Sequence, residues 1–169
     1  MGEPGRNPDL ASAGEAPWLR HAAPQDEEFL LAVFAASRAP EYSLAGLNGA
    51  RLDKLLRMQF RAREQSYAAR FPGSHPAIVM AGGKQVGCVR LARSTHEYRL
   101  VNIEILPEFQ NRRIGSAVAR EFLEEARRTG KPLRLSVAKS NMRSVRFYRR
   151  LGLTICGDDG VYLEMEMAP

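Results

Sequence analysis

Hydrophobic residues recur at two different spacings along the chain, and the spacing changes near residue 76. Before that point, apolar side chains recur every three or four positions in two segments, residues 26–37 and 52–70, which predicts two helices. The turn-rich residues 40–48 separate these helices, and Phe71-Pro72-Gly73 ends the second. A short strand is predicted at residues 18–22, ahead of both helices.

After residue 76 the apolar residues alternate with polar ones, as they do in strands. Residues 77–81 and 86–92 form a predicted hairpin around Gly82-Gly83, and residues 99–106 continue as a third strand. The remaining expected elements are helix 115–129, strand 133–138, helix 141–151 and strands 153–157 and 161–167. This order predicts a mixed α/β fold with a central sheet flanked by helices.

Length and composition predict one domain. The chain has 169 residues, of which 44% are hydrophobic, enough to fill a single core. Residues 1–16 carry almost no large apolar side chains, so we expect a flexible tail there and one domain from residue 17 to 169. No segment reaches the ~20 apolar residues of a membrane span, and the chain does not begin like a signal peptide. We therefore expect a cytoplasmic protein with no membrane partner.

Cysteine and histidine residues indicate no particular chemistry. Cys88 and Cys156 lie far apart within apolar runs, so we expect both to be buried, inert thiols. His21, His75 and His96 are isolated and show no metal-ligand spacing, so we expect no bound metal.

Positive charge is concentrated in one window of the sequence. The formal net charge is +6, and residues 110–152 hold twelve Lys or Arg against three Glu, so this window carries +9 and the remainder −3. Such a window suits a polyanion, either nucleic acid, an anionic membrane surface or a phosphorylated cofactor. A solvated helix face explains the same charge, and the motifs within the window decide between these interpretations.

The segment from Leu106 to Ser116, LPEFQNRRIGS, joins a predicted strand to a predicted helix. The first N–H groups of a helix have no internal partner, and the helix dipole adds about half a positive charge there. A pyrophosphate can therefore bind at this turn through backbone groups. A single turn of this kind is weak support by itself, because Gly and Ser are common at helix starts.

The helix predicted at residues 141–151 carries a second constellation. Asn141 and Tyr148 are two helical turns apart and therefore share one face of that helix. Taken singly, Asn141 is better explained as a helix cap, and Tyr148 as a core residue whose hydroxyl reaches the rim.

Together the two segments resemble the GNAT superfamily of N-acetyltransferases. Gln110-Asn111-Arg112-Arg113-Ile114-Gly115 resembles the family's cofactor motif of Gln or Arg, two residues, Gly, one residue, and Gly or Ala, although Arg113 replaces the first Gly. Asn141, Tyr148 and Leu151-Gly152-Leu153 resemble a second motif of the family. The resemblance covers residues 76–167 and implies a GNAT-like acyl-CoA N-acyltransferase fold, an α/β fold whose central sheet is mostly antiparallel.

The resemblance also implies that acetyl-CoA donates an acetyl group to an amine. Ile105 would pair its backbone with the pantetheine arm, Asn141 would reach that arm, and Tyr148 would protonate the departing thiolate as a general acid. The pyrophosphate is assigned to the loop and the helix start, which comprise Gln110, Asn111, Arg112, Arg113, Ile114, Gly115 and Ser116.

The acceptor amine must lose a proton, and Glu104 is the candidate general base. It interrupts an otherwise apolar strand just before the cofactor loop. A carboxylate on a solvated or hydrogen-bonded face explains the same pattern. Glu164 and Glu166, on the polar face of the last strand, are weaker alternatives.

Two other functions fit parts of the sequence. Arg113 in the motif, combined with a missing base, would leave a cofactor-binding sensor or scaffold without turnover. Binding of nucleic acid is not expected, because the basic window has one aromatic pair, Phe147-Tyr148, and no recognition motif.

The acceptor stays open as a small-molecule or peptide amine. Asp158 and Asp159 would suit a cationic acceptor, although a hairpin turn needs no such purpose. Family members often form homodimers, and the sequence leaves the oligomeric state open.

Overall fold

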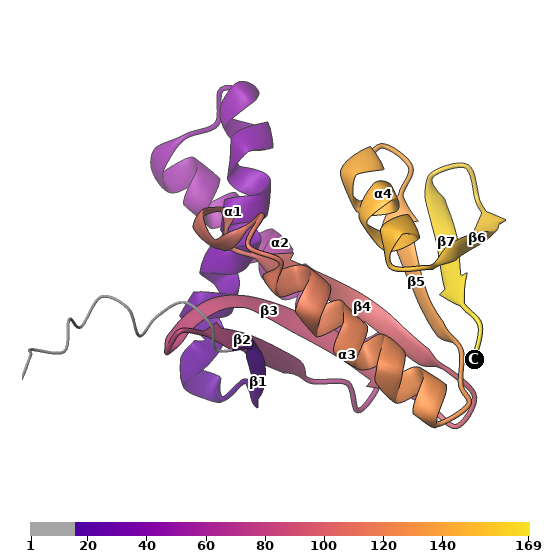
Figure 1. The fold of residues 1–169 in the computed structure, drawn as a ribbon. Coiled ribbons are helices and arrows are strands. Elements are labelled where there is room, and N and C mark those ends of the chain that lie inside the picture. Colours follow the sequence, from indigo (N-terminus) through magenta and orange to yellow (C-terminus); the bar gives the residue numbers. More distant parts are fainter. Residues whose placement is uncertain (1–15) are drawn as a thin grey trace, which may run out of the picture.

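The structure is a computed structural model that describes residues 16–169. The tail expected at residues 1–16 lies, apart from Ala16, outside the described residues. Within residues 16–169, seven strands form one sheet in the order β1-β2-β3-β4-β5-β7-β6 (Figure 1). The strands are β1 Trp18–His21, β2 Pro76–Ala81, β3 Lys84–Arg93, β4 Tyr98–Ile105, β5 Leu133–Ala138, β6 Thr154–Asp158 and β7 Tyr162–Met167.

Neighbouring strands are antiparallel except for β4 and β5, which run parallel. The expected fold class, an α/β fold around a mostly antiparallel sheet, is therefore confirmed.

Helices cover both faces of the sheet (Figure 1). On one face, α1 (Glu27–Leu44) and α2 (Gly49–Arg70) pack with Ile78 and Cys88. On the other, α3 (Ile114–Arg128) and α4 (Met142–Arg150) belong to the core cluster that contains Val79 and Val89, as the alternation of side chains along a strand requires. None of the helices in residues 16–169 has the length and apolar character needed to cross a bilayer.

Helix α1 is longer than the sequence predicts, because it continues past Ser37 and through Pro40 to Leu44. Proline removes one backbone donor and crowds the preceding turn, which is why residues 40–48 were expected to form a loop. Contacts between α1 and α2 offset that cost. The Tyr42 hydroxyl, beyond the proline, donates a 2.7 Å hydrogen bond to Oε1 of Gln59 on α2.

The prediction of two buried cysteines is right for Cys88 and wrong for Cys156, which is exposed. Cys88 lies on β3 under α1 and α2, where burial raises the pKa of its thiol. Cys156 lies in the edge strand β6, where the pairing with β7 shifts register between Ile155 and Gly157. An apolar run in an edge strand is not buried unless a helix covers it.

The sheet opens between β4 and β5. These strands pair at Tyr98 with Leu133 and at Arg99 with Arg134, and they have no further pairs, although β4 continues to Ile105. Figure 1 shows the two strands diverging from this contact. Backbone groups along the facing edges are therefore left without a strand partner, and they are available to a ligand.

Candidate active site

The loop between β4 and α3 begins with one turn of 3-10 helix, Pro107–Phe109, and ends at Arg113, the N-cap of α3. The first backbone bond of the helix is donated by Ala117 to the Arg113 carbonyl, at 3.0 Å. Within residues 16–169, the N–H groups of Ile114, Gly115 and Ser116 have no acceptor. Three free N–H groups at the positive end of a helix are suited to bind an anion.

Two residues of this loop have left-handed backbones, Asn111 at φ 61° and Arg113 at φ 64°. They are the non-glycine residues with positive φ in the described part of the chain, and such conformations are concentrated at functional sites. Glycine adopts this backbone most readily, so the structure gives the physical reason why the family motif has Gly where this chain has Arg113. The departure at Arg113 keeps the loop conformation and adds a side chain.

Ile105 lies at the open edge of β4. The Leu106 N–H donates to the Val86 carbonyl on β3 at 2.9 Å, and alternation along the strand turns the backbone of Ile105 toward the opening. Nε2 of Gln110 donates a 2.8 Å hydrogen bond to the carbonyl of Ile105. The N–H of Ile105 is therefore the group at this position that is left for a ligand.

Helix α4 lies against the same loop. Nη2 of Arg143 donates a 3.2 Å hydrogen bond to Oδ1 of Asn111. Asn141 caps the helix, with its Oδ1 accepting from the N–H of Ser144 at 3.0 Å. The structure thus brings together the two segments that the sequence singled out, and it gives Asn141 the capping role that its position alone suggested.

Tyr148 is 9% exposed and lies in the core that α3, α4 and the sheet share. Its ring meets that of Phe147 edge to face, with centroids 5.0 Å apart. Its hydroxyl makes no hydrogen bond within residues 16–169, and burial raises the pKa of the phenol above its usual value. The hydroxyl is thus a protonated group without a partner.

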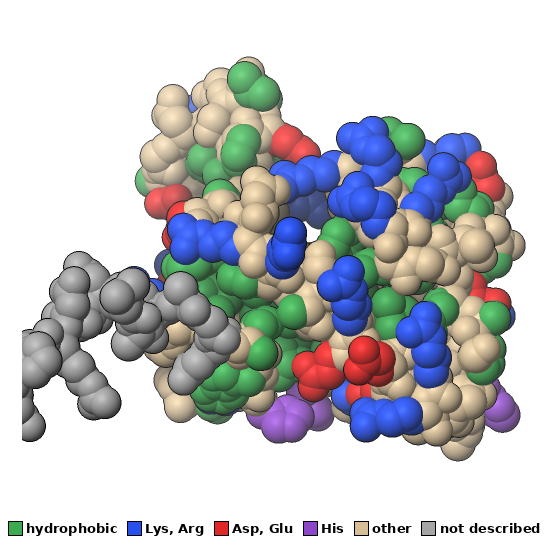
Figure 2. Space-filling view, in the orientation of Figure 1, with side chains coloured by type: hydrophobic (Ala, Val, Ile, Leu, Met, Phe, Trp, Pro, Cys, Tyr) green, Lys and Arg blue, Asp and Glu red, His purple; other side chains and the backbone are tan. Residues whose placement is uncertain are grey.

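Positive side chains gather over the start of α3 and over α4 (Figure 2). Arg112 stacks on the ring of Phe109, at 5.4 Å. None of the arginines in this group forms an ion pair within residues 16–169; the group is Arg112, Arg113, Arg143, Arg146, Arg149 and Arg150. Their unbalanced charge lies beside the free N–H groups and favours a polyanionic ligand there.

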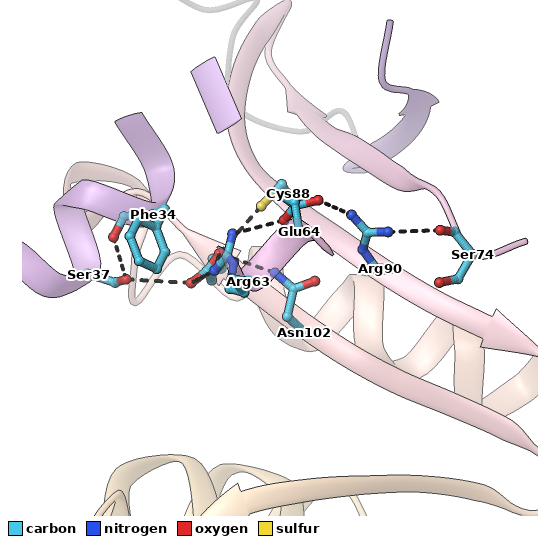
Figure 3. A network of polar contacts seen from close by, with 9 residues as sticks. Phe34, Ser37, Arg63, Glu64, Ser74, Cys88, Arg90 and Asn102 are labelled. Carbon is cyan, nitrogen blue, oxygen red and sulfur yellow. Dashed lines mark hydrogen bonds and ion pairs between the residues drawn. The ribbon is translucent and has the colours of Figure 1, made fainter. Parts of the chain in front are cut away.

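Glu104 faces the other side of the sheet, toward α2, and is part of a polar network (Figure 3). Nη1 of Arg63 donates to both carboxylate oxygens, each at 3.0 Å. Nδ2 of Asn102 donates to Oε2 at 3.1 Å, and the Ser37 hydroxyl lies 3.5 Å from Oε1. Glu104 precedes Ile105 in β4, and its carboxylate already accepts several hydrogen bonds.

The network continues away from the opening. Glu64 follows Arg63 on α2 and forms an ion pair with Arg90 of β3, which is 5% exposed. Arg90 also donates to the Ser74 carbonyl at 2.8 Å. Sequence reasoning missed this network, although Arg63 stands three residues after the buried Phe60 in the apolar stripe of its helix. A charge at such a position indicates a buried partner.

The other acidic candidates are also engaged. Glu164 pairs with Arg99 at 2.8 Å, and Glu166 with Arg134 at 2.5 Å. Asp158 pairs with Lys139 at 2.7 Å, which lowers the pKa of its carboxyl.

Asp159 accepts hydrogen bonds from the N–H groups of Val161 and Tyr162 and so stabilises the β6–β7 turn. No cluster of three or more potential metal ligands occurs in residues 16–169.

Solved structures share this fold at low sequence identity. PaiA N-acetyltransferase from Thermoplasma acidophilum, in complex with coenzyme A, has a TM-score of 0.68 and 19% identity, covering 92% of this chain and 100% of that chain. An acetyltransferase from Thermus thermophilus has a TM-score of 0.66 and 20% identity, covering 92% and 98%. A GNAT family acetyltransferase from Elizabethkingia anophelis, with acetyl-CoA bound, has a TM-score of 0.62 and 12% identity, covering 92% and 100%.

A search of curated protein sequences finds no significant match. The model of the acetyltransferase (GNAT) family matches residues 34–153, which include α2, the opening, the loop between β4 and α3, and α4. Because this match covers well over half of the chain, the protein belongs to the acetyltransferase (GNAT) family.

Proposed function

We propose that the protein transfers the acetyl group of acetyl-CoA to a primary amine, by direct attack of the amine on the thioester. The observation that carries this function is the opening between β4 and β5, which lies beside the free N–H groups at the start of α3. A long thioester with a phosphorylated end can place its phosphates at the helix and its acyl end in the opening at the same time.

The chain offers groups for each part of the donor. The N–H groups of Ile114 to Ser116 suit the pyrophosphate, together with Asn111, Arg112 and Arg113 of the loop. The N–H of Ile105 suits a carbonyl of the pantetheine arm, with Gln110 holding this edge of β4. Asn141 is proposed to reach the arm through its Nδ2, because its Oδ1 is engaged in the helix cap.

The transfer needs two proton movements. The amine nitrogen bonds to the thioester carbon, the C–S bond breaks, and the thiolate takes the proton of the Tyr148 hydroxyl. Because burial raises the pKa of this phenol, the proton is present at neutral pH. The proton of the amine passes to Glu104, directly or through a water molecule.

The test is amine-dependent release of coenzyme A thiol, with a panel of small-molecule and peptide amines and mass spectrometry of the products. We expect acetylated amine in amounts equal to the thiol, at a rate that a chelator does not change. Acetyl-CoA at about 100 times its Kd should stabilise the fold by about 2.7 kcal/mol. Binding without turnover for every amine would contradict the enzyme and favour a sensor or scaffold.

A further inference from the structure

Four charged residues of alternating sign lie in a row between α2 and the sheet (Figure 3). The row runs from Arg90 of β3 through Glu64 and Arg63 of α2 to Glu104 of β4. Its last member is the neighbour of Ile105 at the opening. The two positive and two negative charges of the row sum to zero, so the row needs no external ion to neutralise it.

Stability does not explain the pair at the end of this row. The side chains of Arg63 and Glu104 are 14% and 19% exposed, and a buried ion pair is rarely more stabilising than apolar side chains of the same volume. Nε of Arg63 is fully buried and has no hydrogen-bond partner within residues 16–169, which adds a further cost. Polar groups that lower stability are typical of functional sites.

Three aromatic rings fix the position of the Arg63 guanidinium. Its guanidinium lies 4.5 Å from the ring centroid of Phe34 and 5.6 Å from those of Phe60 and Tyr67. From this position Nη1 bonds both oxygens of Glu104. The carboxylate cannot turn away from the opening without losing both of these bonds.

We propose that Arg63 is a positioning residue, which holds the carboxylate of Glu104 beside the opening in the orientation that receives the acceptor's proton. This inference rests on the proposed acetyl transfer. Within residues 16–169, Oε2 of Glu104 also accepts from Asn102 and lies 3.7 Å from Sγ of Cys88, whereas Oε1 has, besides Arg63, the 3.5 Å contact with Ser37.

Oε1 is therefore the carboxylate oxygen with fewer partners, and we assign it to the acceptor. The acceptor amine, or a water molecule in contact with it, replaces the Ser37 hydroxyl at this oxygen. As the new C–N bond forms, one N–H bond of the amine breaks and one O–H bond forms on Glu104. The bonds of Arg63 and Asn102 keep Oε2 in place during this step.

The test compares two arginine-to-methionine variants of the same helix. Arg63→Met keeps an apolar stem over Phe34 and removes the guanidinium. Arg57→Met is the matched control, because Arg57 makes a similar pair with Glu28, at 2.7 and 3.0 Å, in an exposed position. We expect Arg63→Met to lower kcat about 10²-fold, as a misplaced catalytic group does, while KM for acetyl-CoA and the kcat of Arg57→Met stay within about twofold of wild type.

A double-mutant cycle then shows whether Arg63 acts through Glu104. In a Glu104→Gln background, Arg63→Met should change kcat by less than about twofold, because the carboxylate that it positions is already absent. If Arg63 is purely structural, Arg63→Met should lower the melting temperature and should lower kcat equally in both backgrounds. If Arg63→Met does not fold, Arg63→Lys replaces it, because an ammonium group lacks the planar guanidinium that stacks on Phe34 and so holds its nitrogen less firmly at Glu104.

The outcomes separate this inference from the proposed function. Wild-type kcat in folded Arg63→Met, or an equal loss in both backgrounds, overturns the positioning role and leaves acetyl transfer intact. No thiol release by the wild-type protein with any amine overturns acetyl transfer, and the positioning role with it.

Discussion

Arg143 on α4 donates a 3.2 Å hydrogen bond from Nη2 to Oδ1 of Asn111, in the loop before α3. Asn111 has a left-handed backbone at φ 61°, which few residues other than Gly adopt and which Asn tolerates comparatively well. The bond anchors the side chain of this residue to a neighbouring helix. Helix α4 therefore helps to shape the loop that we assign to the pyrophosphate.

Arg143→Met should weaken coenzyme A binding. We expect the Kd to rise about 3- to 10-fold, because the loop loses a charge-assisted hydrogen bond that holds Asn111. Arg150→Met is the control. Arg150 lies on the same helix, and its substitution removes the same charge without removing a hydrogen bond to the loop. Isothermal titration gives both constants. An equal rise in the two variants would mean that long-range charge alone sets the affinity.

Arg113→Gly should bind coenzyme A slightly more weakly, by about two- to fivefold, because a charge beside the anion site is lost. The free energy of unfolding should change by less than about 1 kcal/mol, because relief of the left-handed backbone opposes the greater chain entropy of Gly. Arg113→Val should lower it by about 1–3 kcal/mol, since a β-branched residue fits this backbone poorly. Tighter binding by Arg113→Gly would show that the arginine obstructs the loop.

Two glycines near the site should respond differently to alanine. A Cβ at Gly87 would lie 2.3 Å from the Glu104 carbonyl oxygen, so Gly87→Ala should cost about 2 kcal/mol or more of unfolding free energy. A Cβ at Gly115 would lie 3.7 Å from Cγ1 of Ile105, an ordinary contact. Gly115→Ala should therefore keep or slightly raise stability. Denaturant titration and calorimetry of both variants check this contrast, and a large stability loss in Gly115→Ala would contradict it.

Tyr148→Phe should lower kcat about 10²- to 10⁴-fold, as the loss of a positioned proton donor does. The Kd for acetyl-CoA should change little, because the hydroxyl acts on sulfur only as negative charge develops there. Packing against Phe147 survives the change. Single-turnover thiol release, with acetyl-CoA bound beforehand and amine in excess, measures the effect. A rate within about twofold of wild type would leave Tyr148 a core residue.

Asp26 should make the stability of the fold depend on pH in the acidic range. Its carboxylate accepts from Arg20 at 2.8 and 2.9 Å and from the Ala23 N–H at 2.7 Å, and these bonds, with that of Arg20 foremost, hold its pKa well below the usual value. The unfolded chain therefore takes up this proton first as the pH falls. The stability that Asp26 contributes is full above the unfolded pKa of about 4 and is lost below it.

The measurement compares urea midpoints of wild type, Asp26→Asn and the exposed control Asp53→Asn at pH 7 and pH 3. Asp26→Asn should be clearly less stable than wild type at pH 7, and the difference should shrink at pH 3. A difference of the same size at both values would rule out this carboxylate as the source.

Hydrophobic spacing located the strands and helices of residues 16–169, because alternation and helical periodicity are properties of a single segment. The loop between β4 and α3 is local in the same sense. Its strand, turn and helix start are contiguous from Leu106 to Ser116, so their chemistry can be predicted without knowing what surrounds them. The link between Asn111 and Arg143 could not be predicted, because it joins segments 32 residues apart.

Periodicity records which side of an element is apolar, and it does not record which element faces that side. Arg63 and Glu104 each interrupt an apolar pattern, and they pair only because α2 lies across β4. The extension of α1 through Pro40 likewise depends on its contacts with α2, as the bond from Tyr42 illustrates. The sequence by itself determined the order of the elements and the strand-to-helix turn to which we assign an anion. Tertiary packing decided the opening beside Ile105, because it depends on where β4 and β5 cease to pair.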